Sequence, residues 1–176
     1  MKKLQQTVAL GFCTALLPVA LAAAPQEGDR EFSLSGTGTS DKDFDNSNFG
    51  ISGDIGWYTS PDLSLGIRQS VSYADIEGEG VTDDAWNGST RGYANYHFGS
   101  GNARPFLGAS LGGIYGDNVK ESAFAGLEFG LKYYVLESTY ILGRAEYQFF
   151  FDSGDSAEDN FDDGAWAYVL GVGFNF

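Results

Sequence analysis

The sequence predicts an all-β protein, an eight-stranded antiparallel up-and-down transmembrane β-barrel. Residue types alternate with a period of two along most of the chain, which indicates strands with two different faces. The 176 residues include 25 glycines and 15% aromatic residues, a composition typical of antiparallel barrels. The alternating segments are even in number, as they are in single-chain bacterial barrels.

The N-terminus has the features of a secretory signal peptide. Two lysines near the start precede an apolar segment over residues 8–21. That segment is shorter than the roughly 20 residues of a membrane-spanning helix, and Ala20 and Ala22 fit the cleavage pattern of small residues. We therefore expect residues 1–22 to be a cleaved signal peptide and residues 23–176 to form the outer-membrane barrel domain.

The first four strands are predicted from alternation between large apolar residues and small or polar ones. Leu34 lies on the large face of the first strand and Trp57 on that of the second. In the third strand Ile67 precedes Arg68 on the opposite face, and Tyr96 lies on the large face of the fourth. These strands are expected over residues 31–39, 49–58, 63–74 and 86–98.

The next three strands repeat this pattern, with Leu107, Leu127 and Tyr147 on their large faces. They are expected over residues 105–116, 122–135 and 139–151. The connections after the second, fourth and sixth strands are short, and the turn before the fifth covers residues 99–104. The other connections are mostly longer and acidic, and they cover residues 40–48, 75–85, 117–121 and 152–164.

The last strand, residues 165–176, has the clearest pattern. One face is large and apolar and the other is small enough to pack inside a narrow barrel. The large face consists of Trp166, Tyr168, Leu170, Val172, Phe174 and Phe176. With this strand the sequence resembles the outer-membrane β-barrel family typified by outer-membrane proteins A and X and the opacity proteins. The resemblance implies a Gram-negative outer-membrane location, and it implies that Phe174 and Phe176 belong to the signal read by the barrel-assembly machinery.

A soluble lipocalin-like barrel or a sandwich is the alternative fold. An interior built from the smaller face, with its glycines, serines and charges, is too polar for a soluble core. The sequence therefore favours the membrane barrel.

The net charge of −14 comes mostly from the longer connections. Outer-membrane barrels have short periplasmic turns and longer extracellular loops, so we expect the acidic loops outside and both mature termini in the periplasm. This charge sign disfavours nucleic acid as a partner. We expect contacts with outer-membrane lipid and lipopolysaccharide, through divalent cations, and a monomer.

Charged residues within the predicted strands all fall on the small face, where they would point into the barrel. Because acids and bases are equal in number, we expect an ion-pair network that fills the lumen. The predicted network consists of Glu31, Asp54, Arg68, Arg91, Glu128, Lys132, Arg144 and Glu146. An eight-stranded barrel is just wide enough for its side chains, which favours a plug over a conducting path.

Candidate catalytic and metal-binding residues are not found. His97, the only histidine, is predicted to point inward without the serine and acid of a triad. The acidic loop after the seventh strand lacks the spacing of an EF-hand, and Cys13 leaves with the signal peptide. We therefore expect no cofactor and a non-enzymatic protein with a structural or surface-interaction role. The alternatives are a narrow porin-like channel and, third, a lipid A-modifying enzyme.

Overall fold

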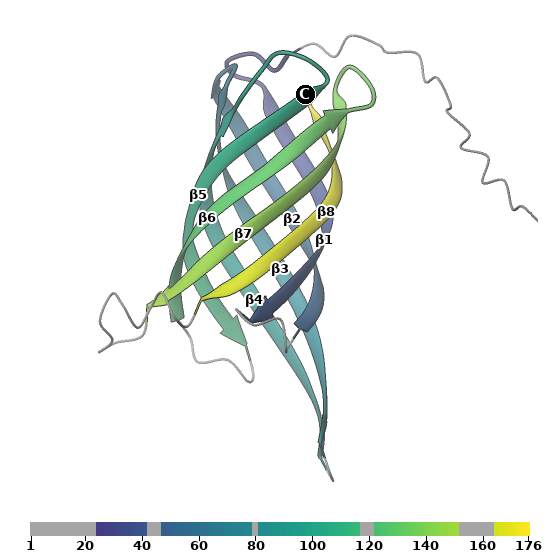
Figure 1. Ribbon diagram of the computed structural model, residues 1–176, viewed down its shortest axis with the longest axis vertical. Coiled ribbons are helices and arrows are strands. Elements are labelled where there is room, and N and C mark those ends of the chain that lie inside the picture. The colour runs from purple at the N-terminus through teal and green to yellow at the C-terminus, as the bar shows by residue number, and fades with distance from the viewer. Residues whose placement is uncertain (1–23, 42–46, 79–80, 117–121, 152–163) are drawn as a thin grey trace, which may run out of the picture.

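The computed structural model is described over residues 24–41, 47–78, 81–116, 122–151 and 164–176. Eight antiparallel strands form one closed barrel in which each strand pairs with the next and β1 pairs with β8 (Figure 1). The predicted fold class is confirmed. The strands are β1 Arg30–Asp41, β2 Ser47–Ser60, β3 Leu63–Gly78, β4 Val81–His97, β5 Ala103–Gly116, β6 Ser122–Tyr134, β7 Thr139–Phe151 and β8 Ala165–Asn175.

The two ends of the barrel differ. The turns after β2, β4 and β6 and the C-terminus lie at one end, which we call the turn end (Figure 1). There Arg30 and Phe176 exchange two backbone hydrogen bonds of 2.9 Å, so β1 begins at the level of the barrel where β8 ends. At the opposite end, the hairpin end, β3 and β4 project beyond the other strands as a two-stranded ribbon (Figure 1).

This ribbon corrects the loop predicted over residues 75–85. Strand β3 continues to Gly78 and β4 begins at Val81, and the two pair without interruption as far as these residues. Acidic and glycine residues suggested a loop, but the hydrogen bonds of an antiparallel ladder join backbone groups and accept such a sequence. The predicted signal peptide and the predicted loop over residues 117–121 lie outside the described residues, as does nearly all of the predicted loop over residues 152–164.

The two faces of the strands are inverted relative to a soluble protein. On β2, Ile51 is 64% exposed, whereas the next residue, Ser52, is 2% exposed. Leu170 on β8 is 70% exposed, and its neighbour Val169 is buried. Large apolar side chains therefore cover the outside and polar ones fill the inside, which is the distribution required of a barrel surrounded by lipid. Among the described residues, no helix is long and apolar enough to cross a membrane.

Glycines make room for large inward side chains. A Cβ atom on Gly66 would collide with the Tyr93 ring, and one on Gly173 would collide with the Tyr140 ring. At these two positions a tyrosine ring occupies space that a side chain on the neighbouring strand would otherwise fill. The high glycine content of the sequence is thus partly a packing requirement of the interior.

Candidate functional site: the ion-paired lumen

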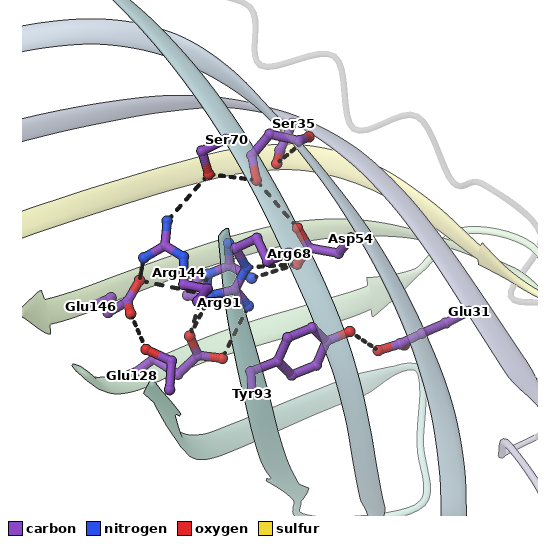
Figure 2. A network of polar contacts seen from close by, with 12 residues as sticks. Glu31, Ser35, Asp54, Arg68, Ser70, Arg91, Tyr93, Glu128, Arg144 and Glu146 are labelled. Atoms are coloured by element: carbon purple, nitrogen blue, oxygen red, sulfur yellow. Dashed lines mark hydrogen bonds and ion pairs between the residues drawn. The ribbon is translucent and has the colours of Figure 1, made fainter. Parts of the chain in front are cut away.

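Six charged side chains meet inside the barrel in a group that we call the arginine layer (Figure 2). They come from β2, β3, β4, β6 and β7, and each is no more than 6% exposed. The layer consists of Asp54, Arg68, Arg91, Glu128, Arg144 and Glu146.

Arg68 makes the largest number of ion pairs in this layer. Its two terminal nitrogens donate to the Glu128 carboxylate at 2.7 and 3.2 Å, and its Nε donates to Asp54 at 2.9 Å. The two-point contact matches the planar guanidinium to the carboxylate. Arg144 also donates to Asp54, at 3.0 Å. One carboxylate is therefore shared by two arginines.

Strand register explains why two arginines lie side by side. Arg68 on β3 is the direct cross-strand partner of Arg91 on β4, an arrangement that is unfavourable for like charges. Glu146 from β7 reaches across the lumen and offsets the repulsion between these two arginines. Its Oε2 accepts a 2.6 Å hydrogen bond from Arg91 and lies 3.7 Å from Arg68. The layer has three arginines and three carboxylates, so its formal charge cancels.

A second group, the tyrosine layer, surrounds one carboxylate nearer the turn end. Lys132 is hydrogen-bonded to Glu31, and the hydroxyls of three tyrosines donate to the same carboxylate at 3.1 to 3.3 Å. The Lys132 ammonium also lies 5.0 Å from the centroid of the Tyr140 ring, within cation–π range. The layer consists of Glu31, Tyr58, Tyr93, Lys132 and Tyr140.

Tyr93 connects the two layers. Its hydroxyl donates to Glu31 at 3.2 Å, and the Arg68 guanidinium lies over its ring at 4.7 Å (Figure 2). The contents of the barrel are therefore continuous from Arg68 to Lys132.

The turn end of the lumen holds His97 and Arg104, both 1% exposed. Arg104 donates to the Pro61 carbonyl at 2.7 Å and to the Asp62 carboxylate at 3.1 Å. His97 Nδ1 lies 3.3 Å from the Asp62 carbonyl oxygen, and its ring packs near Phe106. Among the described residues, the hydrogen bond of His97 goes to a backbone carbonyl, and the Asp62 carboxylate is bonded to Arg104, so the hydrogen-bonded serine, histidine and acid of a triad are not seen here.

Arg104 was missed by the sequence analysis, which placed it in the turn over residues 99–104. The structure places it in β5, buried in the lumen. A usable signal was present, because Arg104 is two residues before the inward-facing Phe106 and so shares its face. Arg30, also outside the predicted first strand, begins β1 and is exposed at the turn end.

A polar cluster lies on the outward face, where lipid-facing side chains are otherwise apolar. Gln69 donates to the Tyr115 hydroxyl at 2.6 Å and accepts a 2.6 Å hydrogen bond from Thr90. Polar groups facing hydrocarbon must be satisfied within the protein, and these three side chains satisfy one another.

All eight residues of the predicted network lie inside the barrel, in the arginine and tyrosine layers. Phe174 and Phe176 lie outside at the turn end and are 45% and 63% exposed. Within the described ranges, no three His, Cys, Asp or Glu side chains are grouped so as to hold a metal ion. The lumen carboxylates are instead paired with arginine or lysine.

Comparison with known proteins identifies the family. The family model described as the OprF membrane domain matches residues 3–176. The chain belongs to this family. It is 30% identical over 138 residues to outer membrane porin F of Pseudomonas aeruginosa, an alignment that covers 70% of this chain and 37% of that protein. The chain thus spans well under half the length of this relative.

Solved structures support the same fold. The N-terminal β-barrel domain of Pseudomonas aeruginosa OprF has a TM-score of 0.59 at 22% identity, covering 86% of this chain and all of that one. Neisserial surface protein A has a TM-score of 0.62 at 16% identity, with coverage of 84% and 96%. Together with the family match, these likenesses show that the protein is an outer-membrane β-barrel. The predicted outer-membrane location is thereby confirmed.

Proposed function

We propose that this protein is a closed outer-membrane barrel that stabilises the envelope and presents its loops for surface interaction. The observation that carries the proposal is the filled lumen. The eight charged side chains of the two layers are each no more than 6% exposed, and they pair with one another across the barrel. A small solute crossing the barrel would have to separate buried ion pairs, which leaves charges uncompensated at a high energetic cost.

The proposed orientation in the membrane follows from the different lengths of the connections at the two ends of the barrel. Outer-membrane barrels place short turns in the periplasm and longer connections outside. The turn end, with its three short connections and the termini of the mature domain, is then periplasmic, and the β3–β4 ribbon points outward. The acidic residues of the longer connections support contact with lipopolysaccharide phosphates through divalent cations, since the two negative surfaces would otherwise repel.

The proposed route to the membrane uses both chain ends. Residues 1–22 act as the cleaved signal peptide, and Phe174 and Phe176 contribute to recognition by the barrel-assembly machinery. Support for the second role comes from their outward position at the turn end, where the final strand is accessible. The single closed sheet supports a monomer, because its strands leave no unpaired edge.

A narrow channel is the second candidate, and one feature of the arginine layer favours it. Arg144 has two nitrogens, Nε and Nη2, without a hydrogen-bond partner among the described residues, and Arg68 lies within ion-pair distance of three carboxylates. Such a layer has alternative pairings. The relative of similar sequence carries the name porin. A lipid A-modifying enzyme, the third candidate, has no such support.

Single-channel conductance separates the first two candidates. The refolded protein is inserted into planar bilayers, and we expect no steps over many insertions. Reproducible steps that change with Arg144→Gln, and stay unchanged with the outward-facing Ile67→Leu, would establish the channel instead. Analysis of lipopolysaccharide after incubation tests the enzyme, since released acyl chains would contradict a non-enzymatic role.

A further inference from the structure

The β3–β4 ribbon has two strand edges that no other described strand covers. Towards the hairpin end, β2 pairs with β3 only as far as Tyr73, and β5 pairs with β4 only as far as Asn87. The pairing of β3 with β4 continues beyond both points, over residues 74–78 and 81–85. In this part the ribbon projects past the rest of the barrel (Figure 1). Each of its two strands therefore has one edge without a partner strand among the described residues.

An open strand edge can bind extended polypeptide. In an antiparallel pair, about half of the backbone N–H and C=O groups of each strand point away from its partner. Over a segment as short as residues 74–78, these groups can form roughly five hydrogen bonds with an added strand. Addition of a strand to an exposed sheet edge is a general mode of peptide recognition. The ribbon thus provides the backbone part of a binding site for an extended segment.

The charge of the ribbon determines which segment can bind. Residues 74–78 and 81–85 include the four acids Asp75, Glu77, Asp83 and Asp84, and no lysine or arginine. Asp75 and Asp84 are direct cross-strand partners, an arrangement that is unfavourable for like charges. A second copy of the ribbon would add negative charge, so these acids oppose self-pairing. A segment rich in lysine or arginine would instead reduce the repulsion, and this contrast gives specificity.

The basic residues of the described ranges lie elsewhere. Arg30 is exposed at the turn end, the opposite end of the barrel from the ribbon. The other five are buried in the lumen, where acidic side chains lie within ion-pair distance of each. They are Arg68, Arg91, Arg104, Lys132 and Arg144. A base that balances the ribbon is therefore not found within the described part of this chain, which favours a basic partner.

We propose that the β3–β4 ribbon binds an extended lysine- or arginine-rich segment of a partner polypeptide, which adds to one of its open edges as a further strand. The proposal rests on the outward orientation proposed above, and it names the chemistry of the partner that this surface takes. Backbone pairing supplies the affinity, and the acidic residues supply the selectivity. The lumen takes no part, so binding does not depend on whether the barrel conducts.

The test uses the refolded protein in lipid nanodiscs and a fluorescein-labelled short peptide of alternating lysine and threonine. Fluorescence anisotropy at physiological ionic strength measures the Kd of this peptide. The control peptide has the same sequence with every backbone amide N-methylated, so it keeps the charges but donates no backbone hydrogen bond. We expect saturable binding of the first peptide. Because several hydrogen bonds are lost, we expect the Kd of the control to be at least about tenfold higher.

Two charge-matched double variants locate the site. Asp83→Asn with Asp84→Asn removes two acids from the ribbon, whereas Asp152→Asn with Asp155→Asn removes two from the connection after β7. Loss of two exposed ion pairs corresponds to a rise in Kd of about two- to tenfold, which we expect for the ribbon variant. The Kd of the other variant is expected to equal that of the unaltered protein. Circular dichroism verifies that both variants keep the β-sheet content of the barrel.

Three results would overturn the inference. The first is the absence of saturable binding to the refolded protein. The second is an equal Kd for the N-methylated peptide, which would show that charge alone attracts the peptide. The third is an equal rise in Kd for the two double variants, which would mean that the ribbon is not the site.

The proposed orientation has a separate readout, which is binding of the same peptide to intact cells that produce the protein. Binding to the refolded protein without binding to such cells would refute the outward orientation and support the ribbon as the site. Bilayer conductance tests the closed barrel independently of both.

Discussion

The arginine and tyrosine layers stabilise buried carboxylates in different ways. In the arginine layer, three carboxylates are held by three guanidinium groups, and Arg68 alone contacts Glu128 at two points. In the tyrosine layer, the single carboxylate of Glu31 receives one ammonium and three phenol hydroxyls. Ser52 also donates to Asp54, and Ser110 and Gln148 donate to Glu146, but the first layer has one guanidinium for each carboxylate, whereas in the second most donors to the carboxylate are neutral.

This difference determines how each layer responds to the loss of one member. Removal of Arg68 from the arginine layer takes two guanidinium hydrogen bonds from the buried Glu128 carboxylate. Removal of the cation from the tyrosine layer leaves Glu31 with three hydroxyl donors. Neutral donors cannot cancel a charge, but they lower the cost of burying it. We therefore expect the arginine layer to be the more sensitive of the two.

Replacement of Arg68 should have the largest effect. Arg68→Met removes both contacts to Glu128 and one to Asp54, and breaking a buried ion pair in this way costs about 3–5 kcal/mol. Urea titration of the barrel folded into lipid vesicles measures the loss in free energy of unfolding. Ile67→Leu, the outward neighbour, is the control and should change stability by less than about 0.5 kcal/mol. A loss below about 1 kcal/mol for Arg68→Met would show that charge balance is unimportant here.

Replacement of Lys132 should cost less. In Lys132→Met, Glu31 keeps its three tyrosine hydroxyls, and the loss of one charged hydrogen bond corresponds to about 2 kcal/mol. The same urea titration compares this variant with Arg68→Met. The double variant Lys132→Met with Glu31→Gln should recover part of the loss, because the glutamine carries no charge. A loss equal to that of Arg68→Met would contradict the protective role of the tyrosines.

Removal of a single hydroxyl should have the smallest effect. Tyr93→Phe deletes one donor to Glu31 but keeps the ring under Arg68, so we expect a loss of about 1 kcal/mol. The matched control is Tyr96→Phe, on the same strand but exposed on the outward face. Equal losses for the two variants in the urea titration would mean that the Tyr93 hydroxyl contributes nothing specific to the layer.

The strands could be predicted from the sequence because residue types alternate with a period of two along the barrel strands. Alternation placed Arg68 and Ile67 on opposite faces, and their different burial agrees with it. The β3–β4 ribbon was not predicted, because acidic residues and glycines are typical of loops. Its backbone pairing nevertheless continues as far as Gly78 and Val81.

The pairing of charges within the lumen could not be predicted. Arg68 and Glu128 lie 60 residues apart in the chain, and alternation gives the face of a residue but not its height in a tilted, staggered barrel. Alternation also gave no reason to assign Tyr58 and Tyr140 to the same carboxylate. Arg104 was lost for a different reason, since the glycine- and serine-containing segment before it suggested that the turn continued.

The pairing of β1 with β8 has a consequence for folding. The strand edges that close the sheet belong to the first and last strands of the barrel, so closure waits until both β1 and β8 are present. Contacts this distant in sequence slow folding, and until they form, two unpaired edges can recruit strands from other chains. The interval before closure therefore carries a risk of aggregation, and a factor that holds the final strand in place would shorten it.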